Sequence, residues 1–375
     1  MLNERIKPIV MPKWGLSMSE GKVTGWLKPV GSHLSVGDEI LEVETDKIAG
    51  VVEAGDGGTL RRVIGEPATV YPVKALLGVI ADDEVSDADI DAYVAGYVTP
   101  AADEDDEAQP GPRTEFVDTP AGTLRYAKRG EGATTVVLVH GFGGDLDNWL
   151  FNIDALAGDA TVYALDLPGH GQSTKTVAEP SLAGLSRALL GFMDTVGIDR
   201  AHLVGHSMGG AVALRAALDA PARVQSLALI GSAGLGPDIN GDYIAGFVGA
   251  SSRRDLKPVL EQLFADPGLV SRQLVDDLLK YKRLDGVGDA LTALSGALFA
   301  DGRQASVLTG DLAALKLPTL VVWGADDRII PAAHADSVAS RATVEVIEGA
   351  GHMVQMEKAG RVNDLVSAHI ERAAS

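Results

Sequence analysis

A strongly acidic stretch divides this 375-residue chain into two regions with different sequence patterns. Between Asp82 and Glu107 there are eleven Asp or Glu residues and no Lys or Arg, which is more than half of the net charge of −20. Residues 101–112 have no apolar periodicity and end in Pro-Gly-Pro, a composition typical of an extended linker. Because the chain is too long for one ordinary domain, we expect domains over residues 1–82 and 114–375, joined by a linker over residues 83–113.

The first part of this linker has a helical pattern. Ser86 and Asp89 have the spacing of a capping box, and apolar residues then recur at helical intervals at Ile90, Tyr93, Val94 and Tyr97. We expect a short helix here. A helix that caps the first domain explains the pattern more simply than one that docks a partner.

The composition excludes several classes of function. The 46% of hydrophobic residues is enough for a large core, and no apolar run approaches the roughly 18 residues needed to span a bilayer. The start of the chain lacks an apolar signal segment, so we expect a cytoplasmic protein. The net charge of −20 disfavours nucleic acid and anionic lipid as partners. Since the chain has no cysteine, it has no disulfide and no thiolate metal site, and any thiol chemistry must come from a cofactor.

The first region contains short β-type runs separated by glycines and predicts a small all-β domain. The runs are Lys22–Leu27, Glu39–Glu44, Val51–Ala54, Gly58–Ile64 and Ala75–Ile80. Two of them flank Asp46 and Lys47, so the pattern places Lys47 at the tip of a hairpin.

Four segments of this region resemble the lipoyl domain of acyltransferase components of 2-oxo-acid-dehydrogenase type: Met11–Gly21, Val36–Asp38, Glu44-Thr-Asp-Lys47 and Pro72–Ile80. The resemblance covers nearly all of residues 5–81. It implies that Lys47 carries covalent lipoate, which would supply the sulfur atoms that the chain lacks. In the related biotinyl domains methionines flank the modified lysine, whereas here Asp46 and Ile48 do, which favours lipoate.

The second region alternates apolar runs with helix-length segments, which predicts an α/β fold with a mostly parallel sheet covered on both faces. The apolar runs are Thr135–Val139, Ala160–Leu165, Ala201–Val204, Val224–Ile230, Thr319–Val322 and Thr343–Ile347. Active sites of such sheets lie at the carboxyl ends of the strands. Three strand ends carry candidate chemistry: His140–Gly144, Gly205–Gly210 and Trp323–Asp327.

Ser207 is the candidate nucleophile. It is the serine of a Gly-x-Ser-x-Gly motif that follows a predicted strand and precedes a helix-forming run, which is the context of a strained turn that exposes a catalytic serine. Glycines on both sides would let the neighbouring backbone pack closely. In such sites an acid and then a histidine follow the serine in the chain.

His352 is the best candidate for the base, because it lies on a loop between the last predicted strand and a C-terminal helix. We expect structural roles for His140 and His206, which adjoin the other two motifs. Asp326 and Asp327 both follow the strand Thr319–Val322 and are the candidates for the acid.

Together these motifs resemble the α/β-hydrolase family over about residues 115–373. The family pattern Gly-x-x-Asp-x-x-x-Pro, met by Gly324, Asp327 and Pro331, favours Asp327 as the acid, with Asp326 as the alternative. The resemblance implies an oxyanion hole formed by the backbone amides of Phe142 and Met208. Helical patterns replace the strands over about residues 235–315, which we interpret as a helical cap. Its basic clusters, Arg253-Arg254 and Lys280–Arg283, could attract coenzyme A phosphates, although an ordinary solvated surface explains them more simply.

A lipoyl domain fused to an α/β-hydrolase domain resembles the acyltransferase component of bacterial acetoin dehydrogenase complexes. The resemblance implies that a thiamine-dependent partner cleaves acetoin, that the acetyl group passes from the lipoyl arm to coenzyme A, and that a flavin-dependent dihydrolipoyl dehydrogenase reoxidises the dithiol. We expect Ser207, His352 and Asp327 to carry out the transfer. Two alternatives stay open: a serine hydrolase acting on an ester, thioester or carbon–carbon bond and anchored by the lipoyl domain, and a carrier whose second domain is inert.

Overall fold

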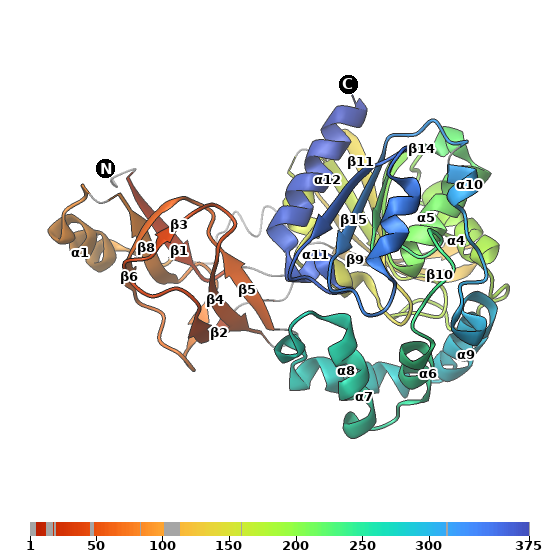
Figure 1. Cartoon of the computed structure of the whole chain (residues 1–375), viewed down its shortest axis with the longest axis horizontal. Helices are drawn as coiled ribbons and strands as arrows, with labels where there is room; N and C mark the ends of the chain where they lie inside the picture. Colours follow the sequence, from red (N-terminus) through yellow and green to blue (C-terminus); the bar gives the residue numbers. More distant parts are fainter. Residues whose placement is uncertain are drawn as a thin grey trace. The chain divides into compact units, whose positions relative to one another are not determined.

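The computed structural model describes residues 5–12, 18, 20–45, 49–82, 84–100, 113–158, 160–312 and 314–374. The chain divides into two compact units, Met1–Gly111 and Pro112–Ser375, which we describe one at a time. Figure 1 labels their helices and strands.

The first unit is built from two antiparallel four-stranded sheets. One has the order β1 (Ile6–Val10), β8 (Leu76–Ala81), β6 (Gly58–Val63) and β3 (His33–Leu34). The other has the order β5 (Ala49–Glu53), β4 (Glu39–Glu44), β2 (Glu20–Trp26) and β7 (Val70–Pro72). Their core includes Val23, Leu41, Leu60 and Leu77. The five β runs expected from the sequence are therefore present.

The predicted helix is also present, as α1 (Asp87–Gly96), and the side chain of Ser86 accepts a hydrogen bond from the Asp89 amide at its start. The helix packs on the outer side of β8, where Ile90 is fully buried in a cluster with Ile6, Leu76 and Val79. The six residues of β8 are all buried, because its alternate side chains face the other sheet and this helix. Thus α1 caps the first unit, which is the simpler of the two interpretations of its sequence pattern.

We predict that Ile90→Ala loosens β8. Removing a buried isoleucine side chain leaves a cavity that costs about 2–5 kcal/mol. In hydrogen-exchange mass spectrometry the amides of Leu76–Ala81 should exchange faster in this variant. Val98, a residue that is 82% exposed, gives a matched control, since Val98→Ala should leave that exchange unchanged. Equal protection of β8 in wild type and Ile90→Ala would show that the helix does not stabilise the sheet.

The second unit contains an eight-stranded sheet whose order is 16-15-14-13-11-12-10-9 in strand numbers. Its strands are β9 (Arg113–Thr119), β10 (Gly122–Arg129), β11 (Thr134–Val139), β12 (Ala160–Leu165), β13 (Ala201–His206), β14 (Val224–Ile230), β15 (Thr319–Gly324) and β16 (Thr343–Ile347). Strand β10 pairs antiparallel with β9 and β12, and the other pairings are parallel. All six runs predicted as strands are strands here. The antiparallel hairpin formed by β9 and β10 was not predicted from the sequence.

Helices cover both faces of this sheet (Figure 1). On one face, Val137 and Val139 of β11 pack in a core with α4 (Leu182–Thr195) and α5 (Met208–Asp219). On the other face, Val136 and Leu138 of the same strand pack with α3 (Ile153–Leu156) and α12 (Ala359–Ala374). Successive side chains of a strand point to opposite faces, so the continuous apolar runs are explained by burial on both sides.

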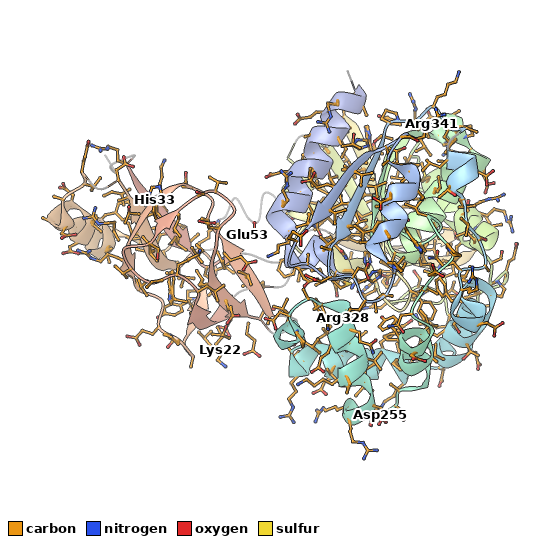
Figure 2. All side chains as sticks on the ribbon, viewed as in Figure 1. Lys22, His33, Glu53, Asp255, Arg328 and Arg341 are labelled. Atoms are coloured by element: carbon orange, nitrogen blue, oxygen red, sulfur yellow. The ribbon has the colours of Figure 1, made fainter. Side chains whose placement is uncertain are left out.

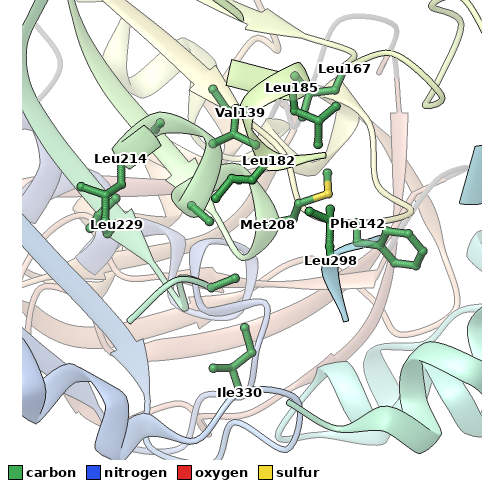
Figure 3. Packing of buried hydrophobic residues seen from close by; sticks show 14 of the residues in the cluster. Val139, Phe142, Leu167, Leu182, Leu185, Met208, Leu214, Leu229, Leu298 and Ile330 are labelled. Atoms are coloured by element: carbon green, nitrogen blue, oxygen red, sulfur yellow. The ribbon is translucent and has the colours of Figure 1, made fainter. Parts of the chain in front are cut away.

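Four helices form a cap between β14 and β15: α6 (Gly241–Gly249), α7 (Arg253–Leu260), α8 (Arg272–Lys282) and α9 (Val287–Leu298). Buried residues of the cap, including Phe247, Leu256 and Leu298, belong to the same core as α4 and α5. Figure 3 shows Leu298 beside Met208 and Phe142. The cap is therefore continuous with the core of its unit. Within the described ranges, no helix has the length and apolar character required to cross a bilayer.

Candidate active site

Ser207 lies at the turn between β13 and α5 in a strained backbone conformation. Its φ is 54° and its ψ is −121°, a region that non-glycine residues rarely occupy and that costs about 1–3 kcal/mol. A side chain at Gly205 would overlap the carbonyl oxygen of Gly209, and one at Gly209 would overlap that of Val139. The glycines of the motif therefore permit the close backbone packing that holds Ser207 in this turn.

His352 and Asp327 form a buried hydrogen-bonded pair at the same end of the sheet. The distance from His352 Nδ1 to Asp327 Oδ2 is 2.7 Å. A carboxylate can only accept, so Nδ1–H donates and Nε2 is left to accept a proton. Asp327 is fixed in turn by the Ile329 and Ile330 amides and the Trp323 indole, at 2.8, 3.0 and 3.0 Å. Asp326 is exposed, and Asp327 is the carboxylate that contacts the histidine.

His206 links the serine turn to His352. Its Nε2 lies 2.9 Å from the carbonyl oxygen of His352, to which it donates, and the two ring centroids are 4.8 Å apart. Burial holds the pKa of His206 well below its ordinary value, so the ring is neutral. Within the described residues Ser207 Oγ has no hydrogen-bond partner. The mechanism proposed below requires Ser207 Oγ to pass its proton to His352.

The loop after β11 packs directly against Ser207. A Cβ on Gly141 would lie 3.0 Å from the Cβ of Ser207. His140 orients this loop, because its Nδ1 lies 2.7 Å from the Gly141 carbonyl oxygen and its Nε2 accepts from the Leu167 amide at 3.0 Å. Burial lowers the pKa of His140, which suits a neutral ring that donates from one nitrogen and accepts at the other.

Two backbone amides near Ser207 in the chain or in the adjoining loop, those of Met208 and Phe142, have no acceptor among the described residues. Met208 is the first residue of α5, where amides have no partner within the helix, and Phe142 follows Gly141. These are the two amides for which the family resemblance implies a role in an oxyanion hole, and that role stays a prediction.

A buried ion pair fixes the neighbouring strand end. Arg125 donates to both carboxylate oxygens of Asp166, at 2.6 and 3.2 Å. Asp166 also accepts from the amides of Leu146 and Gln172, at 2.8 and 2.7 Å. Removing one partner of such a pair leaves a buried charge and costs about 3–5 kcal/mol. No local signal in the sequence indicates this pair, because Arg125 and Asp166 lie 41 residues apart in the chain.

Glu357 connects the His352 loop to the cap, a role that the sequence analysis missed. Its two carboxylate oxygens accept from the Gly351 amide at 2.8 Å and from the Ala265 amide at 2.7 Å. A Cβ on Gly351 would lie 2.7 Å from the Ala265 nitrogen, so only glycine fits this contact. The available signal was an acidic residue at the start of the C-terminal helical segment, five residues after the candidate base.

Three basic residues of the cap clusters, Arg253, Lys280 and Lys282, are engaged by neighbouring groups. Arg253 donates to Asp276, and Lys280 donates to Asp277 at 2.8 Å. The Lys282 ammonium group donates to the carbonyl oxygens of Phe247 and Val248. Figure 2 shows the side chains of this surface, with Asp255 on the outer edge of α7. These contacts favour the simpler interpretation of the clusters over a phosphate site.

Comparisons with known proteins agree with this two-part organisation. A family profile described as alpha/beta hydrolase fold matches residues 134–359, and one described as biotin-requiring enzyme matches residues 7–77. The dihydrolipoyllysine-residue acetyltransferase component of the acetoin cleaving system of Cupriavidus necator is 56% identical over 369 residues, 98% of each chain. The component of the same name from Pseudomonas putida is 50% identical over 98% of this chain and 99% of its own length.

The chain belongs to this family of acetyltransferase components. Its α/β-hydrolase part also resembles solved structures. A meta-cleavage product hydrolase from Pseudomonas fluorescens superposes with a TM-score of 0.64 and 26% identity, over 69% of this chain and 98% of the hydrolase. The acetyltransferase component thus combines a lipoyl domain with a second domain whose fold is shared with serine hydrolases. Of the site residues expected from the sequence, Lys47 lies outside the described residues.

Glu357 leads to a prediction about pH. Burial raises the pKa of Glu357 to about 7, against the effect of the two amides that donate to it. A carboxyl whose pKa is raised on folding stabilises the protein below its unfolded pKa, near 4.3, and this contribution is lost as the pH rises through 7. Urea unfolding of wild type and Glu357→Gln should therefore show a stability advantage for wild type that shrinks between pH 5 and 8. An advantage that grows over this range would mean that the two amides outweigh burial.

Proposed function

We propose that this acetyltransferase component carries acetyl groups on lipoate attached to Lys47, and that Ser207, His352 and Asp327 transfer them to coenzyme A. The observation that carries the proposal is the buried His352–Asp327 hydrogen bond of 2.7 Å at the strand edge of Ser207. It gives a serine with a strained backbone a base whose orientation is fixed. Membership of the acetyltransferase family indicates that the acyl group is acetyl and that lipoate is its carrier.

The described part of the first unit fits a carrier at Lys47. Glu44 of β4 pairs with Ala49 of β5, so Lys47 falls in the sequence between two strands that pair with each other antiparallel. Lipoate, when bound there, supplies a dithiol that carries the acetyl group as a thioester.

The first half of the transfer produces an acylated serine. His352 Nε2 takes the proton of Ser207 Oγ, and the oxygen attacks the carbonyl carbon of the acetyl thioester. The amides of Met208 and Phe142 stabilise the negative charge of the tetrahedral intermediate, a contribution of about 3–4 kcal/mol for one good donor. The C–S bond then breaks, His352 returns the proton to the departing sulfur, and the acetyl group remains on Ser207.

The second half reverses these steps with coenzyme A. His352 takes the proton of the coenzyme A thiol, and the sulfur attacks the acetyl carbonyl carbon. A new C–S bond forms, the C–O bond to Ser207 breaks, and the proton returns from His352 to Ser207 Oγ. Exclusion of water by the cap would favour transfer over hydrolysis. A thiamine-dependent component that loads the lipoyl arm and a flavin-dependent dihydrolipoyl dehydrogenase that reoxidises it would complete the cycle.

A second candidate is hydrolysis at the same serine. The fold similarity to a meta-cleavage product hydrolase favours this reaction. Water, in place of the coenzyme A thiol, would then attack the acetyl group on Ser207. Incubation with acetyl-dihydrolipoamide, with and without coenzyme A, separates the two reactions. Transfer gives acetyl-coenzyme A and little acetate, whereas a hydrolase gives acetate in both mixtures.

We predict that Asp327→Asn lowers kcat for formation of acetyl-coenzyme A about 10³-fold or more, because the base loses its fixed tautomer. Ser207→Ala should be at least as damaging. Asp326→Asn is the matched control, because Asp326 is exposed and adjacent, and its rate should stay within about twofold of wild type. Normal transfer by folded Ser207→Ala would exclude the serine mechanism.

We also predict that the native protein carries a lipoyl mass increment on Lys47 and that Lys47→Arg abolishes it. The Lys47→Arg protein should still transfer acetyl from free acetyl-dihydrolipoamide, because the second domain is unchanged. Lys22→Arg serves as the control and should keep the increment. Peptide mass spectrometry that locates the increment on another lysine would refute this assignment.

A further inference from the structure

A small cavity of about 20 Å³ lies beside the serine turn. Its lining comes from the cap and from the core of the second unit and includes Met208, Ala211, Ala233, Leu298 and Phe299. A cavity of this size holds roughly one water molecule, and a methyl group is of similar size. The cavity therefore has room for a very short hydrocarbon group.

The cavity adjoins the place where an acyl group would be bound. Met208 and Ala211 are on the first turn of α5, directly after Ser207. The Ala233 amide donates to the Ser207 carbonyl oxygen at 3.0 Å. The Phe299 ring meets the edge of the Phe142 ring with centroids 5.7 Å apart. Of the residues proposed as oxyanion donors, Met208 thus lines the cavity and Phe142 contacts its wall, and Figure 3 draws both with Leu298 among the buried residues of the core.

The walls of the cavity are predominantly apolar and well packed. Leu298 and Phe299 are each 7% exposed and belong to the main core of the unit. Two polar residues, Gln304 and Ser306, also line the cavity, and the amide of Gln304 is already engaged. Its Oε1 accepts from the Gly234 amide at 2.6 Å, and its Nε2 donates to the Asp238 carbonyl oxygen at 2.9 Å. The lining thus favours a hydrocarbon group over a polar one.

Small residues on the core side set the depth of the cavity. Ala211 and Ala233 contribute only a methyl group each. Gly234 has a φ of 86°, and a Cβ there would lie 3.3 Å from the Cβ of Ala211. A larger residue at any of these positions would fill the space, whereas the bulk of Leu298 and Phe299 limits it from the side of the cap.

We propose that this cavity binds the hydrocarbon end of the acyl group on Ser207 and restricts the enzyme to acetyl or groups of nearly that size. This inference rests on the proposed function, since it needs an acyl group on Ser207. It assigns Leu298 and Phe299 of the cap, with Ala211 and Ala233 of the core, as the residues that determine acyl length.

The test uses p-nitrophenyl esters of acetate, propionate, butyrate and hexanoate with the full-length protein. Release of nitrophenol reports acylation of Ser207 and does not require coenzyme A or lipoate. Wild type should prefer acetate, and kcat/KM should fall at least tenfold from acetate to butyrate. One methylene group in an apolar pocket changes binding by about 10- to 200-fold.

Leu298→Ala should enlarge the cavity and raise the butyrate-to-acetate ratio of kcat/KM at least tenfold. Leu291→Ala is the matched control, because Leu291 is buried on the same helix but does not line the cavity, so its ratio should equal that of wild type. Equal rates of wild type on acetate and butyrate would overturn the inference even if the variants did not fold. So would an unchanged ratio in folded Leu298→Ala. Absence of acylation by every ester would instead overturn the proposed function, and this inference with it.

Discussion

The backbone at Ser207 is the constraint on which the rest of the second domain depends. Its left-handed φ costs about 1–3 kcal/mol, and that strain persists because the flanking elements are buried on all sides. The Ser207 amide donates to the Ile230 carbonyl oxygen at 2.9 Å, and its carbonyl oxygen accepts from Ala233 at 3.0 Å. Both contacts come from β14 and the loop that follows it. The strand next to β13 thus holds the serine and also begins the cap.

The parallel sheet brings the other parts of the site to the same edge. Strands β11, β13 and β15 end at the loops that carry Phe142, Ser207 and Asp327, and the loop after β16 carries His352. Contacts between these loops then fix the geometry. His206 donates to the His352 backbone, and Glu357 ties the same loop to Ala265 in the cap region. We therefore expect substitutions in the cap near Ala265 to alter the position of His352 through Glu357.

Much of this was predictable from the sequence because the signals are local. The apolar runs predicted six strands of the second unit. The glycines around Ser207 allow close backbone packing, as expected from the sequence. The resemblance to the family pattern favoured Asp327 over its neighbour Asp326, and the structure adds the contact between Asp327 and His352. Glu357 and the Arg125–Asp166 pair were missed because each joins segments far apart in the sequence. The hairpin of β9 and β10 was missed because it lacks the continuous apolar runs of the central strands.

The most direct test of the account is to detect the acylated serine itself. The protein is mixed with acetyl-dihydrolipoamide in the absence of coenzyme A, quenched, digested and examined by mass spectrometry. The account predicts an acetyl group on the peptide that contains Ser207, lost on addition of coenzyme A as an equal amount of acetyl-coenzyme A appears. Formation of acetyl-coenzyme A at the normal rate, with Ser207 unmodified in both mixtures, would contradict it.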